Sequence, residues 1–289
     1  MQQVHLPDGT PLPVLGLGTW RLGEDASSCL GEIHTLHAAI AMGYRLIDTA
    51  EMYGEGGAEQ VVGQAVAAAI RAGDVKREAL YLVSKVYPHN ASRHGTVAAC
   101  ERSLRRLGLD HIDLYLLHWR GTHPLKDTVA AMQSMVAAGK IRHWGVSNFD
   151  VDDLQELMAL LRQGEPGAPG CATNQVYYSL GERGPEFSLL PRMRELQMPL
   201  MAYSPIDQGA LGANETLTAL AERRGLTAVQ VALAWISSQP GVVAIPKAGT
   251  LQHLQLNLAA GAIELDPAEL QAIEGCFPPP RRKLPLAMI

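Results

Sequence analysis

The stretch LIDTAEMYG (residues 46–54) contains a strand end and the turn that follows it. An apolar run stops on Asp48, a tyrosine follows at Tyr53, and glycines lead onward. Such a run predicts a short buried strand. The next residues carry an apolar stripe at helical spacing, formed by Val61, Val62, Ala65, Val66, Ala69 and Ile70. A strand, a turn and a helix therefore make up the unit from which the fold is built.

Eight apolar, strand-like runs of this kind recur along the chain. They cover residues 14–18, 45–48, 80–85, 112–118, 141–146, 171–176, 200–203 and 242–245. Helical segments separate them: Val97, Cys100, Leu104 and Leu107 repeat at 3-4-3 spacing, and Thr227 and Asp266 each begin a capping box. Repeats of roughly 30 residues predict an α/β fold of the (β/α)8 TIM-barrel type. The competing doubly wound sheet lacks its GxGxxG turn.

The N-terminal segment predicts a further small element. Residues 4–6 and 12–14 are strand-like and are separated by Pro7-Asp8-Gly9-Thr10, which indicates a β-hairpin. We expect it to close the bottom of the barrel. At 289 residues, the chain has the length of one such barrel, so residues 1–289 are predicted to form a single domain.

Composition excludes several classes of partner. Hydrophobic residues make up 47% of the chain and charged residues 18%, with a net charge of −5 and no run of like charge. We therefore expect neither nucleic acid nor a membrane surface as partner. The four cysteines lie far apart and predict reduced thiols. No signal peptide and no long apolar segment is recognisable, which favours a cytoplasmic protein.

Polar residues stand where the predicted strands end. Asp48, Lys85 and His118 close the second, third and fourth runs, and Gln175 closes the sixth. Active sites of TIM barrels lie at these ends. His34 and His37 are spaced to share a helix face but have no third ligand at a recognisable spacing, and His118 has no histidine partner, so no metal is predicted.

Seven segments resemble, in order, the signature segments of the aldo-keto reductases. They are IDTAEMYG (47–54), VSKV (83–86), DLYLLHW (113–119), GVSNF (145–149), NQVYY (174–178), AYSP (202–205) and IPK (245–247). The resemblance begins at GLGTW (16–20) and covers nearly the whole chain. It implies an oxidoreductase that reduces a small carbonyl substrate with NADPH, with NADH as the alternative cofactor. We expect a monomer or weak oligomer.

The resemblance also implies a catalytic tetrad of Asp48, Tyr53, Lys85 and His118. Reduction of a carbonyl needs a hydride at carbon and a proton at oxygen, and Tyr53 is the natural proton donor. A lysine ammonium favours the phenolate, and an aspartate paired with it tempers that effect. These are the expected roles of Lys85 and Asp48. A neutral His118 would donate a hydrogen bond that orients the carbonyl.

The cofactor contacts follow from the same resemblance. Ser147, Asn148 and Gln175 would hold the nicotinamide amide, Tyr203 would stack on its ring, and the segment 204–211 would pass over the pyrophosphate. The full set of predicted cofactor residues is Gly18, Thr19, Trp20, Ser147, Asn148, Gln175, Tyr203, Ser204, Pro205, Ile206, Gly209, Leu211, Ile245, Pro246, Lys247, Thr250, His253 and Asn257.

The sequence departs from the family at the adenosine end of the cofactor. Lys247 and Asn257 are present, but the usual serine, arginine and glutamate are Ala248, His253 and Leu256. A guanidinium suits a 2′-phosphate better than a mostly neutral imidazole does. We expect NADPH to be used with a weaker preference over NADH, with Lys247 on the phosphate and Thr250 adding a hydrogen bond.

Trp20, Tyr87 and Trp119 are expected to line the substrate pocket. The forms IDTAEMYG and SKVYP (84–88) are similar to those of compact bacterial reductases, some of which reduce methylglyoxal and aromatic aldehydes. Two alternatives stay open at this point. One is a nucleotide-binding regulatory subunit with the same fold, and the other is a barrel lyase that uses Lys85 as a Schiff-base nucleophile.

Overall fold

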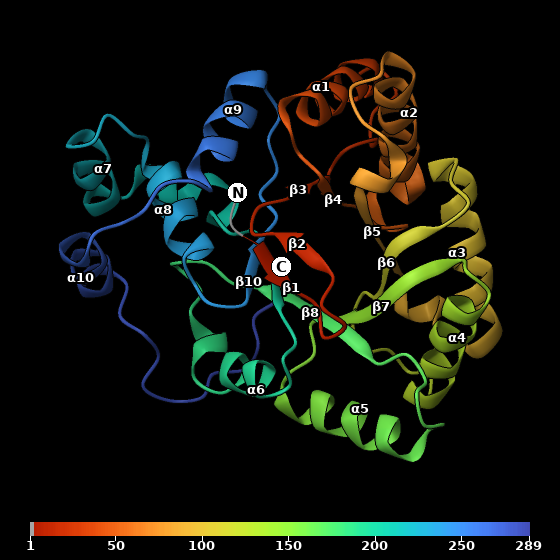
Figure 1. Ribbon diagram of the computed structural model, residues 1–289. Coiled ribbons are helices and arrows are strands. Elements are labelled where there is room, and N and C mark those ends of the chain that lie inside the picture. The colour runs from red at the N-terminus through yellow and green to blue at the C-terminus, as the bar shows by residue number, and fades with distance from the viewer. Residues whose placement is uncertain (1–2) are drawn as a thin grey trace. The chain divides into compact units, whose positions relative to one another are not determined.

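The computed structural model describes residues 3–289, which fold into two compact units (Figure 1). The central unit is Leu17–Asn174, and the terminal unit combines residues 3–16 with Gln175–Ile289. The prediction of a single domain over residues 1–289 stays a prediction.

The central unit alternates strands and helices. Its strands are β3 (Leu17–Gly18), β4 (Leu46–Asp48), β5 (Tyr81–Val86), β6 (Ile112–Leu117) and β7 (Ile141–Ser147). Its helices are α1 (Cys29–Met42), α2 (Gly57–Ala72), α3 (Arg93–Leu107), α4 (Leu125–Ala137) and α5 (Val151–Gln163), with short 3-10 turns η1 (Tyr53–Gly56), η2 (Arg77–Ala79) and η3 (Pro88–Asn90). The five strands pair in parallel in chain order. In Figure 1 helices α1 to α4 follow one another along these strands.

The register brings the carboxyl ends of the strands to one edge. Gly18 is opposite Asp48, Asp48 is opposite Val83, and Lys85 is opposite Leu116. Loop hydrogen bonds continue the pattern, because the amides of Thr49 and His118 donate to the carbonyl oxygens of Val83 and Val86. Parallel strands with helical crossovers are expected to gather their terminal side chains in this way.

Helices α2 and α3 pack closely for reasons visible in the sequence. The predicted stripe of α2 is buried, except that Ile70 is 38% exposed. A Cβ added to Gly63 would lie 2.5 Å from the carbonyl oxygen of Leu107, so only glycine permits this approach. Ser92 caps α3 by accepting a hydrogen bond from the amide of Gly95, and Gly108 ends the helix in the left-handed conformation.

The terminal unit contains the remaining elements. They are β1 (Gln3–His5), β2 (Pro11–Pro13), α6 (Leu189–Glu195), β9 (Leu200–Tyr203), η5 (Asp207–Ala213), α7 (Glu215–Glu222), α8 (Ala228–Ser237), β10 (Val242–Ala244), α9 (Leu251–Ala260) and α10 (Pro267–Cys276), with η4 at Gly184–Glu186. Strand β8 (Cys171–Tyr177) begins in the central unit and ends in the terminal one. Strands β9 and β10 pair in parallel.

Two predictions about local structure are confirmed in the terminal unit. Strands β1 and β2 form the antiparallel hairpin, with Val4 opposite Leu12. Its place at the bottom of a barrel stays a prediction. Thr227 and Asp266 each form the predicted capping box, at the start of α8 and of α10. Across residues 3–289, no helix combines the length and the apolar character needed to cross a bilayer.

Candidate active site

A buried ion pair lies at the carboxyl ends of β4 and β5. The Lys85 ammonium is 2.7 Å from a carboxylate oxygen of Asp48, and it also donates to the carbonyl oxygen of Thr49 at 2.8 Å. The Lys85 side chain is fully buried and that of Asp48 is 3% exposed. A charge this deep is tolerated only when it is paired and hydrogen-bonded, as this one is.

Tyr53 receives the third hydrogen bond of the same ammonium. Its hydroxyl oxygen lies 3.2 Å from Lys85 Nζ, and the ammonium also lies 4.8 Å from the centre of the tyrosine ring. Burial raises the pKa of the Tyr53 phenol above its ordinary value, Lys85 acts in the lowering direction as its charge predicts, and Asp48 acts in the raising direction. Because burial outweighs Lys85, the phenol keeps its proton at neutral pH.

Lys85 is held in its charged form. Burial opposes the charge, but Asp48 and Tyr53 together outweigh burial and raise the pKa of Lys85 above its usual value. A lysine in this state has no lone pair with which to attack a carbonyl. The arrangement therefore supplies a fixed positive charge beside a phenol.

His118 follows β6 and is 8% exposed. Its ring stands edge-on to Tyr53, with 5.7 Å between the ring centres. Burial and then the charge of Lys85 hold the pKa of His118 well below its usual range, so the imidazole is neutral as predicted. Its Nδ1 is buried and has no hydrogen-bond partner anywhere in residues 3–289. A neutral imidazole beside the phenol can act as a hydrogen-bond donor to a carbonyl oxygen.

Aromatic rings continue from His118 along one wall. Trp119 lies 4.9 Å from His118 between ring centres, and Tyr87 packs edge-on to Trp119 at 5.4 Å. His89 lies 4.5 Å from Tyr87 and extends the wall beyond the predicted residues. The structure thus joins two of the predicted substrate residues to the tetrad. The third, Trp20, is half-buried and carries the guanidinium of Arg21 4.5 Å above its ring.

Glu51 holds this wall in place, and sequence reasoning did not single it out. Its carboxylate accepts hydrogen bonds from the amide of Tyr87 at 2.8 Å and from the Asn90 side chain at 2.9 Å. The other oxygen lies 3.3 Å from Arg102 of α3. Glu51 is 7% exposed although it lies within the IDTAEMYG segment. The signal available in the sequence was a second carboxylate within that segment, three residues after Asp48.

The cofactor residues predicted in the central unit lie beside the tetrad. Thr19 is buried and donates from its amide and its hydroxyl to the carbonyl oxygen of Asp48. The Asn148 side chain donates to the carbonyl oxygen of His118 at 3.1 Å and to the Ser147 hydroxyl at 3.3 Å. Asn148 has a φ of 58°, an uncommon left-handed conformation that Asn tolerates. Asn174 braces this loop through both backbone groups of Phe149.

The terminal unit holds the residues predicted for the nicotinamide ring and the pyrophosphate. Tyr203 stacks on Tyr177 with ring centres 5.8 Å apart, which sets the plane of its ring. Ser204, Asp207 and Gln208 all have φ near 50°, and Gly209 has φ 99°. Left-handed residues can turn backbone N–H groups toward an anion. In this loop the amides of Asp207 and Gly209 donate to the carbonyl oxygens of Ser204 and Ile206. The fixed plane of the Tyr203 ring and the left-handed turn fit a nicotinamide dinucleotide.

Hydrogen bonds anchor this loop through residues that sequence reasoning missed. The Asp207 carboxylate accepts from the Tyr177 hydroxyl at 2.9 Å and from the Ser179 hydroxyl. Gln175 is buried at the end of β8, and Pro205 and Leu211 are buried in the loop, whereas Ile206 is half-buried and Gly209 is exposed.

The segment predicted for the adenosine end is more exposed. Lys247, Thr250 and His253 are exposed, while Ile245, Pro246 and Asn257 are buried. The Thr250 hydroxyl accepts from the amide of His253 and so caps α9. Its predicted hydrogen bond to the cofactor would come from a side chain already employed as a cap.

The family follows from comparison with known proteins. The sequence model of the Aldo/keto reductase family matches residues 14–277. The chain belongs to this family. It is 48% identical to methylglyoxal reductase YeaE of Escherichia coli (strain K12), with 100% of both chains covered. It is 37% identical to glyoxal reductase of Bacillus subtilis (strain 168), over 94% of this chain and 91% of the relative.

A solved aldo-keto reductase has the same fold. The enzyme from Klebsiella pneumoniae in complex with NADPH is 45% identical, with a TM-score of 0.91 over 100% of this chain and 99% of that one. The predicted α/β barrel is therefore confirmed, and the chain is an oxidoreductase of the aldo-keto reductase family. The roles of the individual site residues stay predictions, although Asp48, Tyr53, Lys85 and His118 do lie together.

Proposed function

We propose that the chain reduces 2-oxoaldehydes and simple aldehydes with NADPH and that Tyr53 donates the proton. The observation that carries the proposal is the Lys85 ammonium, which is shared between Asp48 at 2.7 Å and the Tyr53 hydroxyl at 3.2 Å. This contact places a permanent positive charge beside the group that must lose a proton. A purely structural ion pair between Lys85 and Asp48 would not require the additional hydrogen bond to the Tyr53 hydroxyl.

The residues divide the work at the carbonyl oxygen. Tyr53, protonated at neutral pH, donates its hydroxyl proton as negative charge grows on that oxygen. The phenolate that remains is stabilised by Lys85, whose raised pKa keeps it charged, and Asp48 fixes the position of Lys85. His118 donates an N–H to the same oxygen and orients the substrate.

The reduced nicotinamide of NADPH, when bound, supplies the hydride. In this chain Ser147, Asn148 and Gln175 would hold its amide, and Tyr203 would support its ring. The left-handed loop that begins at Ser204 would bind the pyrophosphate through backbone N–H groups.

Substrate size is set by the aromatic wall. The ring of Trp119 lies between those of His118 and Tyr87, with ring centres 4.9 Å and 5.4 Å away respectively. An apolar wall beside a single hydrogen-bonding corner suits a short carbonyl compound with little polar surface. The names of the two relatives, methylglyoxal reductase and glyoxal reductase, support this substrate class.

The test is NADPH consumption with a panel of 2-oxoaldehydes, aldehydes and ketones. We expect 2-oxoaldehydes to be preferred and Tyr53→Phe to lower kcat by about 10²–10⁴-fold, the range for loss of a general acid. Tyr81→Phe is the matched control, because that phenol is also hydrogen-bonded, to His143 at 3.0 Å, but Tyr81 begins β5 rather than following a strand end. If Tyr53→Phe kept most of the activity with every substrate, the proton-donor assignment would be wrong.

Cofactor preference needs its own measurement. Lys247 is the basic residue of this segment that can pair with a 2′-phosphate, and the replacement of the family arginine by His253 weakens that pairing. We expect a modest preference for NADPH in kcat/KM. Equal kcat/KM values for NADPH and NADH would remove the NADPH part of the proposal.

The two alternatives receive less support. A Schiff-base lyase needs a neutral lysine, and the raised pKa of Lys85 works against it. Borohydride trapping of substrate on Lys85 would reinstate the lyase. A regulatory subunit would not need the shared ammonium at Tyr53. We place the enzyme in the cytoplasm, because Cys29, Cys100, Cys171 and Cys276 are all free thiols. A monomer or weak oligomer stays a prediction.

A further inference from the structure

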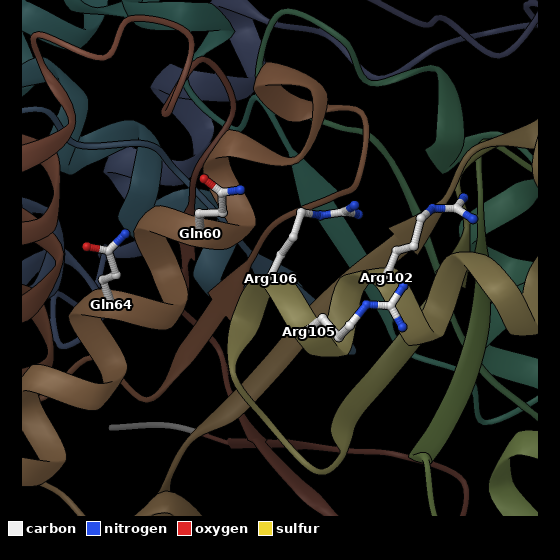
Figure 2. Close-up of a pocket in the computed structure, with 5 residues that line it drawn as sticks. All are labelled: Gln60, Gln64, Arg102, Arg105 and Arg106. Atoms are coloured by element: carbon white, nitrogen blue, oxygen red, sulfur yellow. The ribbon is translucent and has the colours of Figure 1, made fainter.

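A cavity of about 310 Å³ lies between α2 and α3 and is lined by charged and amide side chains. Gln60 and Gln64 come from α2, and Arg102, Arg105 and Arg106 come from α3. Figure 2 shows the three guanidinium groups extending to the same side of α3. Their spacing of three and four residues places them on one helix face. We call these five residues the α3 arginine site.

Arg105 brings an uncompensated charge to this site. Within residues 3–289 its guanidinium makes no hydrogen bond or ion pair, whereas its backbone carbonyl oxygen accepts from the amide of Gly108. The nearest acidic side chain on the same helix is Glu101, one turn away, and it is already paired with Lys140. Lys140 lowers the pKa of the Glu101 carboxyl, and Arg105 contributes to the lowering to a smaller extent. The guanidinium group of Arg105 is therefore available to bind a ligand, and the residue is exposed to solvent.

Arg102 and Arg106 are only partly neutralised by the acidic residues behind them. Arg102 is 39% exposed and has one ion pair, to Glu51 at 3.3 Å. Arg106 pairs with Glu59 at 2.5 Å and lies 3.9 Å from Glu51. Both carboxylates have other donors too: the Ser84 hydroxyl binds Glu59, and the Tyr87 amide binds Glu51. Three guanidinium groups thus face two carboxylates that are shared.

We propose that the α3 arginine site binds a phosphate group. A phosphate carries more than one negative charge and offers oxygens in the geometry that a guanidinium fork matches. Gln60 and Gln64 add amide donors for the remaining oxygens. The net charge of the chain is −5, so this positive cavity runs against the overall charge. The site is outside the tetrad and does not depend on the proposed reductase activity.

The α3 arginine site is connected to the aromatic substrate wall through Arg102 and Glu51. A phosphate competes with Glu51 for Arg102, and Glu51 holds the amide of Tyr87 and the side chain of Asn90. Weakening the contact between Arg102 and Glu51 loosens the Tyr87 side of the wall. This consequence, unlike the binding itself, rests on the proposed function. We expect bound phosphate to raise the KM for the carbonyl substrate while kcat stays nearly constant.

Binding is tested by calorimetric titration of the full chain, saturated with NADPH so that its own phosphate subsites are filled. The probes are inorganic phosphate and glycerol 3-phosphate, which separate free phosphate from a phosphorylated metabolite. Saturable binding of either is expected, and Arg105→Gln should weaken it about tenfold, the loss of one charge-assisted contact. Arg105 is the chosen variant because it leaves the Arg102 and Arg106 ion pairs intact.

Arg93→Gln is the control, since Arg93 is exposed on the same helix and lies outside the cavity. If neither probe binds saturably at millimolar concentration, the proposal is overturned. It is overturned equally if Arg93→Gln weakens binding as much as Arg105→Gln, because the binding is then nonspecific. If phosphate binds without changing the KM for the carbonyl substrate, the proposed coupling through Glu51 is overturned, whereas the proposed phosphate site is supported.

Discussion

Asp48 and Asp113 are both buried carboxylates with a cation at 2.7 Å, yet they lie at opposite ends of the parallel strands of the central unit. Asp48 is the last residue of β4, and Asp113 is the second residue of β6. Asp113 accepts hydrogen bonds from Arg77 and from the amide of Leu82, and Arg142 lies 3.3 Å away. Its cations are guanidinium groups, which never deprotonate in proteins.

The difference lies in what else the cation touches. Arg77 also donates to the carbonyl oxygens of Leu80 and His111, so its other hydrogen bonds go to the backbone and none goes to a reactive side chain. Lys85 instead gives a hydrogen bond to a phenol that is half-buried. The same ion-pair chemistry therefore serves stability at the amino ends of the strands and prepares a proton donor at the carboxyl ends.

The largest expected effect comes from neutralising each carboxylate in turn. Asp48→Asn should lower kcat about 10²-fold, because Lys85 loses the group that fixes it beside Tyr53. Asp113→Asn should leave kcat unchanged but lower the free energy of unfolding by about 3 kcal/mol, since Arg77, whose side chain is only 15% exposed, then loses its counter-charge. Steady-state kinetics and urea unfolding of both variants measure these effects. The comparison fails if Asp113→Asn loses activity while it remains folded.

Glu51 is a third buried carboxylate, and it can be compared with Asp48, which fixes a catalytic cation, and with Asp113, which stabilises the fold. Its carboxylate holds the amide of Tyr87 and, within residues 3–289, has no hydrogen bond to a tetrad side chain; only its backbone amide donates to the carbonyl oxygen of Lys85, at 3.4 Å. Glu51→Gln should raise the KM for the carbonyl substrate about tenfold and leave kcat within about twofold, because the wall loosens while the proton donor is intact. A fall in kcat at unchanged KM would place Glu51 with Asp48 instead.

A smaller effect is expected at the edge of the Asp113 cluster. Arg142 is 50% exposed and its contact with Asp113 is 3.3 Å, longer than that of Arg77. Arg142→Gln should cost less than about 1 kcal/mol of unfolding free energy, as exposed ion pairs do. Measuring it beside Arg77→Gln, which should cost more, shows whether burial sets the rank. Equal losses would argue that distance and burial do not distinguish the two arginines.

The smallest effect concerns pH. Tyr53 must be protonated and its pKa is raised above 10.0, so donation is lost only above that pH. His118 must be neutral and its pKa is lowered below 6.5, so its function is lost only below that pH. We therefore expect the kcat for reduction to change by less than about twofold between these limits. An inflection inside the window that disappears in Tyr53→Phe would show that the phenol titrates there.

Much of the architecture was accessible from local pattern. The eight strands and the helix caps at Thr227 and Asp266 depend on residues close in sequence, and parallel strands with helical crossovers bring their ends to one edge. For that reason Asp48, Lys85 and His118 were identifiable as neighbours before the fold was known. The same pattern did not indicate that Ile70, part of the predicted stripe, is exposed.

Long-range packing decided the rest. Glu51 finds Tyr87 and Arg102, 36 and 51 positions away, and three arginines of α3 meet two glutamines of α2. Such pairings depend on how helices lie against strands, which residue spacing does not encode. The direction of the Tyr53 pKa is of this kind as well. Its neighbours were named from the sequence, but the depth of burial that outweighs Lys85 exists only once the chain has folded around the phenol.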